Sequence, residues 1–187
     1  MLFKVIKGFD AIACARRLYN AGLFYFDYPP HDLTAIHADW VFVMSQINPR
    51  NEQNPGPITP KQRQAFGFVI ESVGATYGDV WVRDTPGDLF NQGTPISVKQ
   101  PQKASDNAPG IRKVLVGSNA MACAATLVDS GLILKVKNAE EKSVEITSRG
   151  ELNAADADQA ADFDFVVKTV AQRFDGIQVT DEPPELL

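Results

Sequence analysis

This sequence has very few of the residues from which catalytic and metal sites are usually built. It contains two histidines and two cysteines among 187 residues. It has no glycine-rich phosphate loop, no paired-cysteine zinc motif and no calcium loop. We therefore expect a protein that is not an enzyme and that carries no cofactor and no metal.

The two histidines lie close together. His31 and His37 stand beside Asp32 and Asp39 in the segment PPHDLTAIHADW. The pair His31-Asp32 matches a dyad of metal-dependent phosphohydrolases, but that pattern also needs a histidine upstream, and the chain has none. We favour turn residues before a strand, and a metal-dependent hydrolase built on the His31/His37 region stays open as a second alternative.

Cysteine usage and hydropathy bear on the compartment. Cys14 and Cys123 lie among alanines and other apolar residues, which is typical of buried free thiols in a reducing environment. No apolar run reaches the length of about 20 residues that spans a bilayer, and the N-terminus shows no signal-peptide pattern. The expected location is the cytoplasm, or a host cytoplasm or virion if the protein is viral.

Composition predicts a globular chain, because 44% of residues are hydrophobic and 22% are charged. The patterns indicate a soluble α+β fold, with a mixed or largely antiparallel sheet packed by about three helices. We expect one domain over residues 1–176 and an acidic tail over residues 177–187. We find no internal repeat and no low-complexity segment in the sequence.

Three segments have helical signals. The first helix follows Asp10 as N-cap and ends at Gly22, with Arg16 and Arg17 facing solvent. The second begins at a capping box of Thr59 and Gln62 with Pro60 at its first position, and runs to Gly74. The third is the strongest pattern, from Asn153 as N-cap to Gly176.

One segment, 119–128, is ambiguous, because its apolar run has no clear period. It reads either as a short helix capped by Ser118 or as a buried strand. Ser118 as a nucleophile and Cys123 as a reactive thiol are both less favoured than a cap and a core residue.

Strands are expected at branched and aromatic runs. The ranges are 2–6, 40–44, 80–83, 114–116, a hairpin of 132–137 with 144–147, and an edge strand at 177–179. Two Pro- and Gly-rich stretches, 48–58 and 84–110, are expected to be long loops, with one strand inside the second at 96–99.

Charge is unevenly distributed. Residues 151–187 hold nine acidic and two basic side chains, whereas the remainder holds 16 basic and 14 acidic ones. Acids in the first half of the last helix match its dipole, so only the tail calls for a partner. The tail loosely resembles the acidic, apolar-ended tails of single-stranded-DNA-binding proteins over seven residues. The candidate interaction residues are Lys99, Lys103, Arg112, Lys113, Asp181, Glu182, Glu185, Leu186 and Leu187.

The leading hypothesis is a structural subunit of a larger assembly, such as a virion or phage particle, with protein subunits as partners. Its loops and tail would contact neighbouring subunits. The alternative is a nucleic-acid-associated binding protein that uses the basic residues, with Trp81 and Phe90 for stacking. The acidic pI near 5.0 counts against it.

Overall fold

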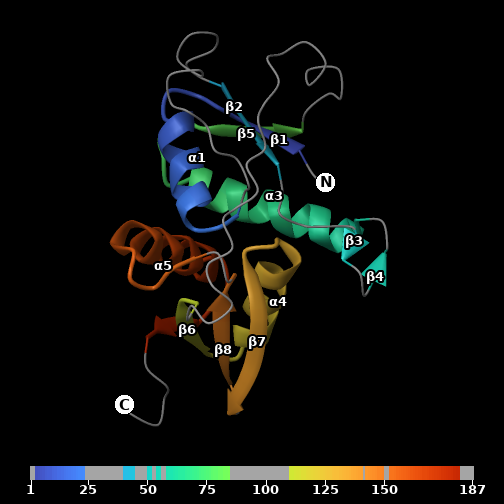
Figure 1. Cartoon of the computed structure of the whole chain (residues 1–187), viewed down its shortest axis with the longest axis vertical. Coiled ribbons are helices and arrows are strands. Elements are labelled where there is room, and N and C mark those ends of the chain that lie inside the picture. The colour runs from blue at the N-terminus through green and yellow to red at the C-terminus, as the bar shows by residue number, and fades with distance from the viewer. Residues whose placement is uncertain are drawn as a thin grey trace.

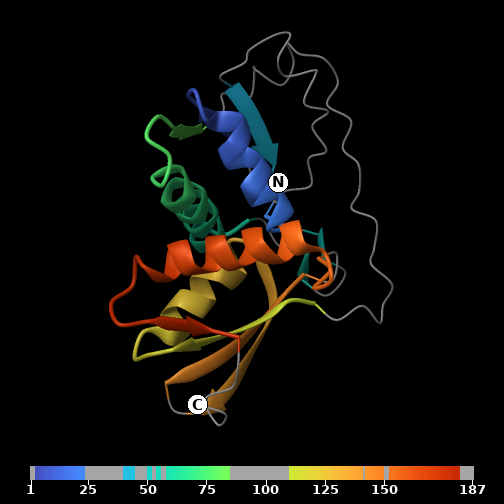
Figure 2. The ribbon, with the colours of Figure 1, turned by 90° about the vertical axis from the view of Figure 1, so that its left-hand side faces the viewer.

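Two antiparallel sheets enclose a double layer of helices. The computed structural model describes residues 3–23, 40–44, 50–51, 54–55, 58–84, 110–140, 142–149 and 152–181. In this part of the chain the helices lie between the two main sheets (Figure 1; Figure 2). The predicted α+β class is confirmed, and the described residues contain four helices where about three were expected.

The first half of the chain builds one sheet and two helices. The sheet has the order β2-β1-β5, and both of its pairings are antiparallel. A further pair of two-residue strands precedes the second helix. The elements are β1 (Phe3–Lys7), α1 (Ala11–Asn20), β2 (Trp40–Met44), β3 (Arg50–Asn51), β4 (Asn54–Pro55), α3 (Pro60–Gly74) and β5 (Trp81–Asp84).

The second half builds the other sheet, in the order β7-β8-β6-β9. All of its pairings are antiparallel as well. The elements are β6 (Arg112–Val116), α4 (Ala120–Asp129), β7 (Ile133–Glu140), β8 (Ser143–Ser148), α5 (Ala157–Ala171) and β9 (Gln178–Thr180). This is the β-α-β-β-α-β connectivity of the split βαβ, or ferredoxin-like, motif.

In the first half, β1, α1, β2, α3 and β5 match β6, α4, β8, α5 and β9 in order and register, whereas β7 has no counterpart among the described residues. Val5 pairs with Phe42 and Arg83, and at the equivalent place Val114 pairs with Glu145 and Thr180. Both α1 and α4 have 10 residues, and both α3 and α5 have 15. The chain is therefore an internal repeat, and the expectation that it has none is wrong.

Aligning residues 3–23 with residues 112–132 makes the repeat visible in the sequence, where ten of 21 positions are identical. The identical pairs are Lys4/Lys113, Val5/Val114, Gly8/Gly117, Ala11/Ala120, Ala13/Ala122, Cys14/Cys123, Ala15/Ala124, Leu18/Leu127, Gly22/Gly131 and Leu23/Leu132. The spacing is 109 residues here, 103 between β2 and β8, and 97 between α3 and α5. A search for one fixed period misses a repeat whose connections differ in length.

A single hydrophobic cluster joins the halves. It contains residues of all four helices and of both main sheets, including Ile6 and Leu18 from the first half and Leu115, Leu127 and Phe163 from the second. Helices pack across the boundary in equivalent pairs, α1 against α5 and α3 against α4. Neither half therefore has its helix layer covered without the other.

Several local predictions can be compared with the structure. The ambiguous segment is the helix α4, with Asn119 at its N-cap in place of Ser118. The capping box at α3 is confirmed, since Thr59 accepts from the Gln62 N–H at 3.2 Å and the Gln62 side chain accepts from the Thr59 N–H at 2.9 Å. The N-cap of α5 is Asp156, because Asn153 closes a separate turn just before it.

Two expected boundaries differ. Residues 48–58 were predicted to lack regular structure, yet Arg50 pairs with Pro55 and Asn51 with Asn54. The helix α5 ends at Ala171, and Gly176 lies in the turn that follows it. The predicted strand at 96–99 and most of the 84–110 loop lie outside the described residues.

Arg17 does not face solvent as expected. Its guanidinium lies 4.0 Å from the ring centroid of Phe165 and 5.8 Å from that of Tyr77, and its Nε is 3.4 Å from Asp162. These partners belong to α5 and to the turn after α3, so Arg17 ties α1 to both. Arg16 is exposed, as predicted.

Candidate functional site

The predicted basic patch is only partly described by the structure. Lys99 and Lys103 lie outside the described residues. Arg112 is exposed, and its Nε is 3.8 Å from a carboxylate oxygen of Glu145 on the neighbouring strand. Lys113 is buried, because its strand position turns it toward the helix layer.

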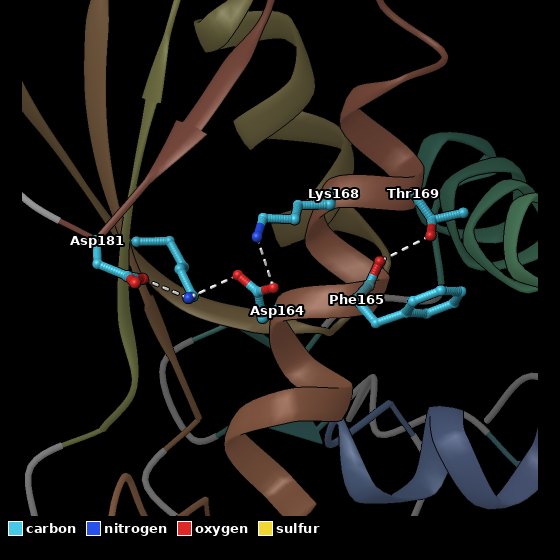
Figure 3. Close-up of polar contacts among 6 residues, drawn as sticks. Asp164, Phe165, Lys168, Thr169 and Asp181 are labelled. Carbon is cyan, nitrogen blue, oxygen red and sulfur yellow. Dashed lines mark hydrogen bonds and ion pairs between the residues drawn. The ribbon is translucent and has the colours of Figure 1, made fainter.

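Lys113 is the buried centre of an ion cluster whose outer members, Asp181 and Lys168, are 75% and 53% exposed. Its Nζ lies 2.7 Å from Asp164 of α5 and also contacts Asp181 just after β9. A second lysine, Lys168, binds Asp164 at 2.8 Å, and Figure 3 shows Asp164 between the two amines. The cluster joins β6, β9 and α5, so two residues expected to bind a partner bind each other.

The charges in this cluster shift its pKa values. Burial alone would lower the pKa of Lys113, but the hydrogen bonds and charges of Asp164 and Asp181 outweigh it and raise the pKa. For Asp164, burial alone would raise the pKa, and the two lysines lower it instead. Each charged form is therefore stabilised by the fold, as in a structural ion pair.

The histidine hypothesis falls on positions 24–39, which lie outside the described part of the chain. Where the structure does describe the chain, no group of three or more His, Cys, Asp or Glu side chains could hold a metal ion. Cys14 and Cys123 are buried, and burial raises the pKa of each thiol to about 12, which keeps both protonated. The tail residues Glu182, Glu185, Leu186 and Leu187 are also outside the described residues.

A different surface stands out, which we name the Phe9–Trp81 patch. The side chains of Phe9 and Trp81 are 84% and 57% exposed, the two highest values among the large hydrophobic side chains described. Trp81 begins β5 opposite Lys7, the last residue of β1, and Phe9 follows two residues later. The N–H of Phe9 donates to a carboxylate oxygen of Asp79 at 3.4 Å, which holds this turn beside the start of β5.

Beside this patch, the backbone of Gly8 packs closely against the backbone of Asp79. Gly8 has a φ of +130°, and a Cβ on it would lie 1.9 Å from the carbonyl oxygen of Asp79. Only glycine fits here. Gly117 in the second half has the same role, with a φ of +146° and the carbonyl oxygen of Gly176 at 2.3 Å from a Cβ.

The internal repeat supplies a comparison for each residue of the patch. Phe9 corresponds to Ser118 and Trp81 to Gln178, both exposed and polar. The same turn and the same strand start therefore form without aromatic side chains. Exposed aromatic side chains at positions where the equivalent structure forms with polar residues are typical of a binding surface.

The residues that pair with β1 differ from their counterparts in the same way. The β1–β2 register pairs Lys7 with Trp40 and Val5 with Phe42. The equivalent positions of the second sheet hold Ser143 and Glu145. These paired positions are therefore aromatic in the first sheet and polar in the second.

Sequence reasoning missed the patch as a unit, although it named Trp81 as a stacking residue. An alignment of the two halves reveals the patch, because the first half has aromatic residues at positions where the second half has polar ones.

Comparison with known proteins adds no relative: no family model, no curated protein and no solved structure matches this chain. Among the described residues, no helix is long and apolar enough to cross a membrane.

Proposed function

We propose that this protein is a non-enzymatic, protein-binding subunit of a larger assembly, such as a virus particle, and that the Phe9–Trp81 patch is its docking surface. One observation carries the proposal. The exposed aromatic residues Phe9 and Trp81 occupy positions at which the second half, with the same backbone arrangement, has Ser118 and Gln178. Aromatic side chains with a rim of charge are enriched at protein interfaces. Lys7 lies opposite Trp81, Arg83 lies two positions along, and the carboxylate of Asp79 lies beside Phe9.

The experiment uses the second half as a guide for the substitutions. A Phe9→Ser/Trp81→Gln variant gives the first half the residues that its counterpart already tolerates. We expect the unaltered protein to sediment as a species larger than one 20.4 kDa chain, alone or with a co-purified partner, and the variant to sediment as one chain. Its melting temperature should be unchanged.

The matched control removes exposed apolar side chains elsewhere. Met121 and Val128 are 50% and 39% exposed on α4. A Met121→Gln/Val128→Thr variant should keep the assembly intact. An unaltered protein that is monomeric at every concentration and retains no partner would contradict the proposal, and so would a control that disassembles as readily as the patch variant.

The acidic tail is a second contact in this proposal, and the structure shows where to cut it. Because β9 pairs with β6 and Asp181 binds Lys113, a truncation after Gly176 would remove part of the fold. A truncation after Asp181 leaves the sheet whole. We expect it to weaken the assembly while the melting temperature stays the same, and unchanged assembly would limit docking to the patch.

A second candidate function, binding of single-stranded nucleic acid, is favoured by one observation. Trp81 is exposed on a sheet face with Lys7 opposite and Arg83 two positions along, and aromatic residues among cations stack on bases. The test is retention on single-stranded DNA at low salt by the unaltered protein and by Trp81→Gln. Retention that falls with salt and is lost in the variant would support this candidate, and no retention at low salt would end it.

A further inference from the structure

The strand that carries Trp81 is at the edge of its sheet. In the described part of the chain, β5 pairs with β1 on one side and with no strand on the other. Figure 2 shows it at the outer margin of the molecule. Such an edge presents a row of backbone donors and acceptors that can pair with another strand.

Side chains alternate along β5. Val82 packs against the hydrophobic core, so Trp81 and Arg83 lie on the opposite, outer face, where both are exposed. One aromatic and one cationic side chain therefore lie two positions apart on the same face of an edge strand. The equivalent strand β9 has Gln178 and Thr180 at these positions.

From this arrangement we infer that the partner at this edge is a second copy of the same chain, which pairs β5 with its own β5 in antiparallel orientation, centred on Val82. Opposite residues of an antiparallel pair share a face, so a symmetric pairing must be centred on a residue. Centring on Val82 puts Trp81 opposite Arg83 of the second copy. The two-fold symmetry repeats this contact, which gives two cation–π pairs.

The equivalent edge strand of the second half, β9, does not fit this partner. In a symmetric pairing of β9, Gln178 would face Thr180 of the second copy, and neither side chain is charged or aromatic. Asp181 next to β9 is already bound to Lys113. Of the two equivalent strands, only β5 therefore has an aromatic and a cationic side chain that can face each other across the pairing.

This inference rests on the proposed function, because it names the partner that binds at the Phe9–Trp81 patch. The test uses two full-length variants, Trp81→Gln and Arg83→Thr, each of which introduces the residue of the second half. Sedimentation equilibrium should show a dimer of the unaltered chain. Each variant alone keeps neither cation–π pair and should dimerise between about 5-fold and 30-fold more weakly.

A mixture of the two variants is the decisive arm. In the mixed dimer, Trp81 of one chain faces Arg83 of the other, so one of the two pairs is restored. The mixture should therefore dimerise more tightly than either variant alone. A variant that merely unfolds cannot produce this rescue, and melting curves check its fold. The Gln178→Ala/Thr180→Ala variant in β9 should dimerise like the unaltered chain.

The outcomes separate this inference from the proposed function. If the unaltered chain dimerises but the mixture of the two variants dimerises no more tightly than either variant alone, the β5 pairing is overturned. A monomer that binds a different protein through Phe9 and Trp81 would overturn the second copy as partner and leave the docking surface in place. A monomer that binds single-stranded DNA, with loss of binding in Trp81→Gln, would overturn both.

Discussion

The guanidinium of Arg17 lies 4.0 Å from the centroid of the Phe165 ring, and this contact joins the first helix of the chain to the last. At the equivalent place in the other half stands Thr126, and there Phe68 and Phe174 meet edge to face with centroids 6.2 Å apart. Equivalent positions of the two halves thus make different contacts: a cation over an aromatic ring in one, and two aromatic rings in the other.

Arg17→Thr tests how much the contacts of Arg17 contribute to the free energy of unfolding. The substitution removes the cation–π contact and the pair with Asp162, and it leaves a residue that the other half accepts. We expect a loss of about 1 to 2 kcal/mol in the free energy of unfolding. Urea unfolding measures it. Arg16→Thr, on the exposed neighbour, should change stability by less than about 0.5 kcal/mol, and equal losses in both variants would contradict the assignment.

The Lys113–Asp164 pair should make the free energy of unfolding depend on pH in the acidic range. The lysines lower the pKa of Asp164, so its stabilisation is complete above the pKa of the unfolded chain and is lost as the pH falls through the lower folded pKa. The pKa of Lys113 is raised, so its contribution is complete below the unfolded pKa and is lost only as the pH rises through the higher folded value. Asp164→Asn should reduce stability at neutral pH and flatten the decline between about pH 5 and 2. Melting curves across this range measure the effect, and Asp175→Asn, on an exposed carboxylate, should leave the decline as it is.

The shared core predicts equal effects of matched core substitutions. Leu18 and Leu127 are both fully buried at equivalent positions of α1 and α4. Leu18→Ala and Leu127→Ala should each cost about 2 to 5 kcal/mol and should each lower one common transition. Calorimetry measures this, with Met121→Ala as the exposed control. Two separate transitions, only one of which shifts, would show that the halves unfold independently.

The close backbone approach predicts a matched pair of glycine effects. Gly8→Ala and Gly117→Ala would each place a Cβ against a carbonyl oxygen at a positive φ. We expect each to cost more than about 1 kcal/mol. A Cβ added to Gly78 would meet no atom within 4 Å, and its φ is not positive, so Gly78→Ala should be close to neutral in the same denaturation experiment.

Much of the local structure was readable from the sequence. The Thr59 capping box, the branched run at 40–44 and the alternating hairpin around residue 142 each depend on neighbours in the chain, and the structure has all three. Gly22 follows the last turn of α1 with a φ of +93°, as its position predicted. These features form from short-range hydrogen bonding and periodicity, which a linear pattern records.

The surface assignments were not readable in the same way. Lys113 and Asp181 looked like separate charges, because nothing local shows that β9 returns beside β6 and brings the two together. Arg17 looked exposed because its aromatic partners are distant in the chain. Charge counts along a sequence do not show which charges the fold brings together.

The sequence by itself determined the α+β class, most of the helix and strand positions and the buried thiols, because periodicity and capping act over a few residues. It also contained the repeat, spread over three unequal spacings. Only the tertiary structure decided that β1, β2 and β5 match β6, β8 and β9 in register, that the helices of both halves share one core and that Phe9 and Trp81 remain outside it. The reason is that register and burial depend on contacts between residues far apart in the chain, and only the matching register shows which exposed residues the fold does not require.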